Sequence, residues 1–379
     1  MYLLKGIMWF MVAMPIIVLF FQDHGLTLAE VMILQGVYSI SVAIFEIPSG
    51  YIADFFGRKK AIILSTILCF IGYVLFSNYS DFYIFMIAEI LIGIGGSLMS
   101  GSDSAIIYDT LLETKNNTKY TKIEGRNYAI GNFSEALAGI LGGFLAATSI
   151  YHPIYVQTII LFFSIPVAFT LVEPSLNKQN LTSKSFPKIT SILKDTLLTD
   201  KKLKWLIIYS ATMGVATLSI AWFCQPFFKS IEIPIVYFGI IWAVLNLSVG
   251  ITSFNAHIVE RKMSPIKIMK ILAIIMPICF FFIAYINSIF ALLFILFIYL
   301  IRGVVTPLLR NYINQQTSSD KRATVLSIRS FFIRISFATS APLLAYLADN
   351  STLNYAFYLL GCIIAFFALL SVYKLSRLY

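Results

Sequence analysis

Several ionisable side chains lie inside long apolar stretches of this sequence, away from the short polar segments that separate those stretches. They are Glu46, Glu89, Asp103, Glu135, Arg302, Arg329 and Arg334. A charged side chain inside a bilayer is costly, so such residues usually mark a proton, ion or substrate pathway. The chemistry that these residue types offer is proton exchange and charge pairing.

Glu89 and Arg302 each stand beside a glycine at a similar place in the two parts of the chain. Glu89 precedes Gly93 in AEILIGIGG, and Arg302 is next to Gly303 in IRGVV. Aligning the two glycines places Arg302 near the pseudo-symmetric equivalent of Glu89, so both side chains are expected to face one cavity. They would form a gate pair or a proton-coupled site. The alternative is a buried, hydrogen-bonded pair with only a packing role.

Three further carboxylates complete the candidate set for proton coupling or for the substrate cavity. Asp103 lies in SGSDSAIIYD, where small residues allow close approach of another helix. It binds a proton or cation, or it only hydrogen-bonds neighbouring serines, and both interpretations stay open. Glu46 and Glu135 lie in two other apolar stretches.

The composition shows which elements must hold these residues. Of the 379 residues, 59% are hydrophobic and 12% charged, whereas soluble domains carry roughly a quarter charged residues. The apolar runs reach about 20 residues, the length of a spanning helix and too long for barrel strands. We therefore expect an all-α membrane protein with about twelve transmembrane helices. The expected spans are 6–22, 29–50, 61–78, 83–108, 123–148, 151–172, 205–228, 234–256, 266–286, 288–314, 323–348 and 351–373.

One long polar stretch divides these spans into two groups of six. We expect an N-terminal half at 1–172, a cytoplasmic linker at 173–204 and a C-terminal half at 205–379, the halves being pseudo-symmetric. Within the linker, residues 186–198 have apolar side chains at helical spacing between lysines. This segment is expected to lie on the membrane surface as an amphipathic helix, or to be a flexible linker.

The distribution of Lys and Arg predicts the orientation in the membrane. Nearly all of them fall in alternate loops, and Lys229 is the one that we place in an outer loop. Basic loops stay on the cytoplasmic side, so both termini are expected there, in the cell inner membrane. The net charge of +10 is explained by these loops, and we expect no nucleic-acid partner. The four cysteines lie inside apolar runs and are expected to be packing residues.

A compact charged turn, SGYIADFFGRKKAI, lies between the second and third expected spans. It resembles the cytoplasmic loop signature of the major facilitator superfamily at Gly50, Asp54, Gly57, Arg58 and Lys59, and departs from it at Phe55. Gly57 permits a tight turn with a backbone angle that other residues resist. The helix count and the charge asymmetry agree with the resemblance over nearly the whole chain.

The turn is interpreted as a conformational latch. Asp54 is expected to face the positive end of the helix that starts near Ser319 and Asp320, and Arg58 is expected to pair with Asp109. Such contacts would hold the two halves together on the cytoplasmic side. The alternative is a solvated loop that only anchors the protein.

The resemblance also implies a place for each helix and a function. In that family helices 4 and 10 line the cavity, helices 2, 5, 8 and 11 form the interface between halves, and helices 3, 6, 9 and 12 lie outermost. The stretch SEALAGILGG matches the antiporter signature of the drug-exporter-like branch only at Gly142 and Gly143. The prediction is a proton-coupled exporter of a small amphipathic or drug-like compound. Proton-coupled import of a small solute and a non-transporting membrane sensor are the alternatives.

The remaining predictions concern partners and cofactors. The expected partners are a small-molecule substrate, protons and the lipid bilayer, and the chain is expected to be a monomer. The three histidines are widely separated, no phosphate-binding loop occurs, and no catalytic constellation stands out. We therefore expect no metal site, no cofactor and no enzymatic activity.

Overall fold

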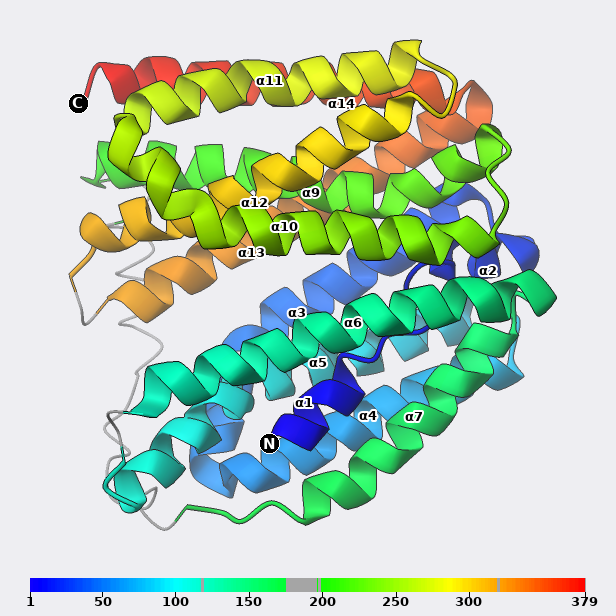
Figure 1. Cartoon of the computed structure of the whole chain (residues 1–379), viewed down its shortest axis with the longest axis vertical. Coiled ribbons are helices and arrows are strands. Elements are labelled where there is room, and N and C mark those ends of the chain that lie inside the picture. The colour runs from blue at the N-terminus through cyan, green and yellow to red at the C-terminus, as the bar shows by residue number, and fades with distance from the viewer. Residues whose placement is uncertain (117–118, 175–195, 197–198, 319–320, 379) are drawn as a thin grey trace. The chain divides into compact units, whose positions relative to one another are not determined.

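The computed structural model describes residues 1–116, 119–174, 196, 199–318 and 321–378 (Figure 1). Five side chains inside these ranges lie outside the description: Ile47, Tyr51, Asp54, Thr121 and Ala323. The regular structure of the described residues is helical throughout.

Seven helices precede the linker and six follow it in the described chain. The first are α1 (Tyr2–Met8), α2 (Ile17–Asp23), α3 (Leu28–Phe56), α4 (Arg58–Asn78), α5 (Phe82–Glu113), α6 (Tyr120–Thr148) and α7 (His152–Phe169). The others are α9 (Lys201–Ser230), α10 (Val236–Lys262), α11 (Pro265–Tyr285), α12 (Ala291–Gln315), α13 (Arg322–Asn350) and α14 (Leu353–Ser376). Among the described residues, 11 helices are long and apolar enough to cross a membrane. The predicted all-α membrane fold is therefore confirmed.

The first expected span, 6–22, is not one helix, and this part of the prediction is wrong. Figure 1 shows α1 and α2 as separate helices joined by non-helical chain. Pro15 lacks an N–H and obstructs the preceding turn of a helix. The freed backbone is satisfied nearby, because the N–H of Val12 donates to Oε1 of the buried Gln157 at 2.7 Å. On α6, a Cβ at Gly142 would lie 2.1 Å from the Val12 carbonyl oxygen, so only glycine fits there.

The chain divides into two compact units, each of which is described by itself. The first unit contains Met1–Leu26, Val37–Ser183 and Pro234–Ala243, and the second contains Thr27–Gly36, Lys184–Ile233 and Val244–Tyr379. Helices α3 and α10 therefore each contribute their first turns to one unit and the rest of their length to the other.

The first turns of α10 and α3 are each held by a specific contact within their unit. In the first unit, α10 crosses α6 where a Cβ at Gly239 would lie 2.0 Å from the carbonyl oxygen of Gly139. In the second unit, Asp349 at the end of α13 accepts hydrogen bonds from the N–H groups of Leu28 and Ala29, at 3.1 and 2.8 Å. This carboxylate caps the positive end of α3.

Two predictions about organisation remain predictions. The division into 1–172, 173–204 and 205–379 is one, since most of the linker lies outside the described residues. The expected amphipathic segment 186–198 is the other, because it also lies outside them apart from Thr196.

Candidate functional site

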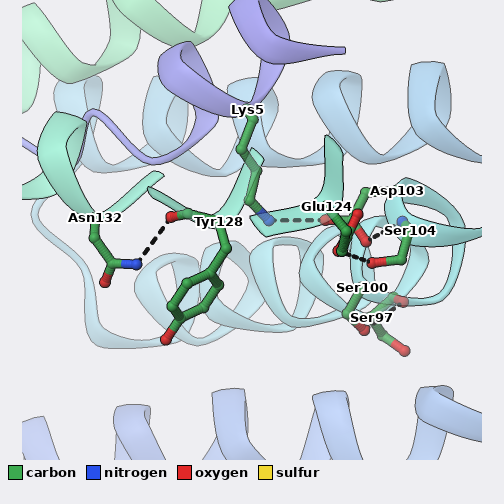
Figure 2. Close-up of polar contacts among 8 residues, drawn as sticks. All are labelled: Lys5, Ser97, Ser100, Asp103, Ser104, Glu124, Tyr128 and Asn132. Carbon is green, nitrogen blue, oxygen red and sulfur yellow. Dashed lines mark hydrogen bonds and ion pairs between the residues drawn. The ribbon is translucent and has the colours of Figure 1, made fainter. Parts of the chain in front are cut away.

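A cluster of charged and polar side chains joins α1, α5 and α6 inside the first unit (Figure 2). Its centre is an ion pair between Lys5 Nζ and Asp103 Oδ2 at 2.8 Å, with the two side chains only 11% and 8% exposed. Lys5 comes from a seven-residue helix near the N-terminus, and Asp103 comes from the middle of α5. An ion pair so largely removed from water lies where charge is costly, which indicates a function.

Small residues bring α1 close enough to α6 for this contact. A Cβ at Gly131 of α6 would lie 3.1 Å from the Trp9 ring and 3.4 Å from Cε of Lys5. The Lys5 ammonium also lies 4.7 Å from the centre of the Trp9 ring, within the range of a cation–π interaction. The Tyr128 ring contacts the Trp9 ring edge-on, with the ring centres 6.5 Å apart. The aliphatic part of the Lys5 side chain thus packs beside Gly131 and the Trp9 ring, and its ammonium group contacts Asp103.

A second carboxylate stands next to the ion pair. Ser104 Oγ donates to Oε1 of Glu124 at 2.5 Å, and its N–H donates to Oδ1 of Asp103 at 2.7 Å. Ser104 therefore connects the two acids, as the dashed lines of Figure 2 show. With one ammonium and two carboxylates, the cluster has a formal charge of −1 when both acids are ionised.

Polar groups around the cluster are left without protein partners among the described residues. Oε2 of Glu124 is buried and unpaired there, and so are both side-chain polar atoms of Asn127. Asn127 lies on α6 and is fully buried. Leaving a buried polar atom unsatisfied costs about 1–3 kcal/mol. The arrangement is therefore suited to accept a proton, water or a polar ligand group.

The structure places Glu89, the carboxylate that the sequence favoured, away from this cluster. Glu89 is buried on α5, within electrostatic range of the Tyr73 hydroxyl. It stands 14 positions before Asp103, about 21 Å along a helix axis, so the two do not share one site. Glu46 and Glu135 are half-buried on α3 and α6, and each has an interaction of its own.

Arg302 lies in the second unit, half-buried on α12. Its guanidinium lies 5.8 Å from the centre of the Tyr299 ring. The predicted pairing with Glu89 involves two units that are each described by itself, and it stays a prediction. The close approach of helices beside each residue is present, because a Cβ at Gly93 would lie 2.7 Å from Ser41 Cβ.

The turn before α4 has the predicted backbone angle and one predicted contact. Gly57 has φ of 103°, in the region that favours glycine. Arg58 Nε and Asp109 Oδ2 form an ion pair at 2.8 Å, which confirms this contact but not its role as a latch. Gly50 lies within α3 and Lys59 in the first turn of α4.

The Asp54 part of the latch is not tested. The side chain of Asp54 and residues 319–320 lie outside the described part of the chain. The predicted contact between Asp54 and the start of α13 therefore stays a prediction.

Sequence reasoning missed Glu173 as a partner of this turn. Its two carboxylate oxygens accept hydrogen bonds from the N–H groups of Arg58 and Lys59, at 2.8 and 2.7 Å. Negative charge at a helix N-terminus is favourable, so Glu173 stabilises the start of α4. A Cβ at Gly57 would lie 3.0 Å from Glu173 Oε2, which explains why a residue without a side chain stands there.

Lys5 and Glu124 were also missed as members of the central cluster, and so was the buried Asn127, three positions after Glu124 on α6. Lys5 precedes the first apolar run and Glu124 opens the fifth, so both look like residues at a membrane boundary. The one available signal was the polarity of the α5 segment around Asp103, which calls for partners on neighbouring helices.

Comparison with known proteins agrees with this architecture. The model of the Major Facilitator Superfamily matches residues 1–304. The uncharacterized MFS-type transporter YxaM of Bacillus subtilis is 25% identical over 235 residues, 61% of this chain and 58% of that protein. Quinolone resistance protein NorA of Staphylococcus aureus is 22% identical over 240 residues, 63% of this chain and 57% of that protein.

A third relative is an uncharacterized transporter, BU466, of Buchnera aphidicola. It is 27% identical over 160 residues, 42% of this chain and 40% of that protein. The chain thus spans about half the length of the curated relatives that it matches.

Solved structures share the fold over almost the whole chain. The nucleoside transporter NupG has a TM-score of 0.80 at 12% identity and covers 98% of this chain and 96% of its own. The D-xylose-proton symporter has a TM-score of 0.74 at 16% identity and covers 98% and 95%. Since the family model covers most of the chain, this protein belongs to the Major Facilitator Superfamily, a family of membrane transporters rather than enzymes.

Proposed function

We propose that the protein is a secondary active transporter that exports a small amphipathic or drug-like compound in exchange for protons, by alternating access. The observation that carries this proposal is the buried ion pair of Lys5 and Asp103 beside Glu124. A carboxylate largely removed from water binds a proton more readily, while a neighbouring ammonium favours its ionised form. The contact between Lys5 and Asp103 therefore depends on whether the carboxylate is ionised.

The break after α1 supports a coupling of this kind. Residues 9–16 are not helical, so α1 and α2 do not form one rigid helix. Helix α1 can therefore shift while α2 stays in place. Protonation of Asp103 removes the charge that holds Lys5 and releases α1 from α5. Loss of the proton restores the ion pair. Proton binding and the position of a helix are thereby linked, as alternating access requires.

Export is supported by a relative rather than by the cluster itself. NorA is a quinolone resistance protein, and the similarity to it covers 63% of this chain. The Lys and Arg distribution supports the cytoplasmic membrane as the location, with both termini inside. We also propose that the transporter acts as a monomer.

The test is transport in proteoliposomes that contain the purified full-length chain under an imposed pH gradient. Norfloxacin, a quinolone, is the first probe, and both gradient directions are measured. Proton-driven movement of the probe against its gradient, with protons moving the opposite way, supports the proposal. Movement in the same direction as protons would indicate import, and no proton-dependent movement of a set of amphipathic probes would refute the coupling.

Two neutralising substitutions on α5 locate the coupling residue. Asp103→Asn should abolish gradient-driven flux and leave substrate-for-substrate exchange in place, because the side chain keeps its size but cannot ionise. Glu89→Gln is the matched change elsewhere on the same helix, and the cluster model predicts that it retains more of the gradient-driven flux. If Glu89→Gln abolishes this flux and Asp103→Asn does not, the coupling site is Glu89, as the sequence first suggested.

A further inference from the structure

The helices of the second unit carry positive charge in their interiors without matching acids. Arg302, Arg329 and Arg334 lie inside α12 and α13. The acidic residues within the described helices of this unit are Glu30, Glu260 and Asp349, and each lies within a turn of a helix end. An uncompensated guanidinium inside a membrane protein requires a counter-charge.

Arg329 is the most buried of these arginines, at 8% exposure. Its Nε donates to Oγ of Ser210 on α9. One turn further along both helices, a Cβ at Gly214 would lie 2.7 Å from the Ile333 side chain, so α9 and α13 are in tight contact here. The arginine is thus held at one nitrogen by a packed helix pair. Among the described residues, the rest of its guanidinium has no protein acceptor.

A second guanidinium stands close to the first. Arg310, exposed on α12, is near enough to Arg329 to repel it electrostatically. The acid at this end of α10, Glu260, accepts a hydrogen bond from Nδ2 of Asn311 at 2.8 Å and forms no ion pair with either arginine among the described residues. Arg329 therefore lies against a hydroxyl and within electrostatic range of a second arginine, and it has no carboxylate partner among the described residues of this unit.

We propose that Arg329, Arg310 and Ser210 form the site for an oxyanion, a carboxylate or phosphate group carried by the transported compound. This inference rests on the proposed transport function and adds the charge of its substrate. Guanidinium groups present several N–H donors in a plane and bind carboxylate or phosphate through two parallel hydrogen bonds. A bound anion also removes the repulsion between the two arginines. The substrate is then amphipathic with an acidic group, not a simple organic cation.

The test measures binding without any proton gradient, so that it is independent of the coupling mechanism. Benzoate and phenyl phosphate are the anionic probes, and benzamide and benzylammonium present a ring of similar size without the negative charge. The thermal unfolding midpoint of the purified full chain is followed against probe concentration at fixed ionic strength, because a ligand of the folded state raises it. Wild-type protein should be stabilised by one or both anions and by neither control compound.

Variants then locate the effect. Arg329→Gln should weaken anion binding by about tenfold or more, as expected for loss of a charge-assisted pair. Arg329→Lys keeps the charge but not the planar donors and should also weaken it. Ser210→Ala should have a smaller effect, because it only frees Nε. Arg377→Gln, which removes a charge beside Tyr373 near the end of α14, is the control and should bind as wild type.

The outcomes separate this inference from the proposed function. Equal stabilisation of wild type and both Arg329 variants, or none of wild type, would overturn the anion site and indicate a counter-charge from a carboxylate of the protein. If Arg329→Gln does not fold, Arg329→Lys and Ser210→Ala decide the question. Anion binding without proton-driven flux would refute the proposed proton coupling and support the anion site. Proton-driven flux without anion binding would support the coupling and refute the anion site.

Discussion

The two units of this protein differ in how their buried basic side chains are paired. In the first unit Lys5 meets Asp103 at 2.8 Å, and Arg58 meets Asp109 at the same distance. In the second unit Arg329 donates to the Ser210 hydroxyl and has no other side-chain partner among the described residues, while the acids of the described helices lie near the helix ends. Among the described residues, these basic side chains of the first unit each have a carboxylate partner, whereas Arg329 of the second unit has none.

Under the two proposals made above, this difference gives the units different tasks. A charge pair that is complete without a ligand can open and close with a proton, which suits coupling. A buried arginine without a counter-ion destabilises the folded protein, and a negatively charged substrate relieves this destabilisation when it binds. Retaining such a destabilising group is typical of binding sites, where function is maintained at the expense of stability.

The largest expected effect comes from breaking the compensated pair. Lys5→Gln leaves Asp103 and Glu124 in the cluster without a base, and removing one partner of a buried pair costs about 3–5 kcal/mol. We expect a clear fall in the thermal unfolding midpoint of the purified protein. The double variant Lys5→Gln/Asp103→Asn should recover most of this loss, since no unpaired charge remains. If the double variant is as unstable as the single one, the contact acts through packing of the lysine stem and not through charge.

An intermediate effect is expected at the turn before α4, where the first unit also pairs its charges. Gly57→Ala places a Cβ at 3.0 Å from Glu173 Oε2 and requires φ of 103° from a residue that resists it. The strain is worth about 1–3 kcal/mol. Gly125→Ala is the control, since nothing lies within 4 Å of its Cβ. Equal unfolding midpoints for the two variants would show that Glu173 does not hold this turn.

The smallest effect on stability is expected at the uncompensated arginine. Arg329→Gln removes a charge that has no acid beside it among the described residues, so the unfolding midpoint of ligand-free protein should stay unchanged or rise. The change in the unfolding midpoint is compared with that of Lys5→Gln, which is purified and measured under the same conditions. A loss as large as that of Lys5→Gln would mean that Arg329 is compensated after all, and the contrast between the units would disappear.

Much of the fold could be predicted from the sequence because its causes are local. Apolar runs of spanning length predicted the helices, and the one wrong span is the one where Pro15 interrupts the run. The turn at Gly57 followed from the local pattern of glycine and charge. The Arg58–Asp109 pair was predictable because both residues lie near helix ends that membrane topology places on one side.

The centre of the candidate site was not predictable in the same way. Lys5 and Asp103 are 98 positions apart, and their meeting depends on Gly131 admitting the lysine stem against α6. Glu89 was the stronger candidate by position, since a carboxylate in mid-span stands out in a sequence, while a lysine at the start of the chain does not. The contact of Arg329 with Ser210 joins residues 119 positions apart and could not be predicted from the sequence.

The sequence by itself determined that this chain crosses a membrane many times, which loops carry positive charge and where a tight turn must stand, because hydropathy, charge and glycine act through neighbouring residues. The tertiary structure decided which charges are compensated. A buried charge is stabilised by what lies within a few ångströms of it, and helix packing brings together residues that are far apart along the chain.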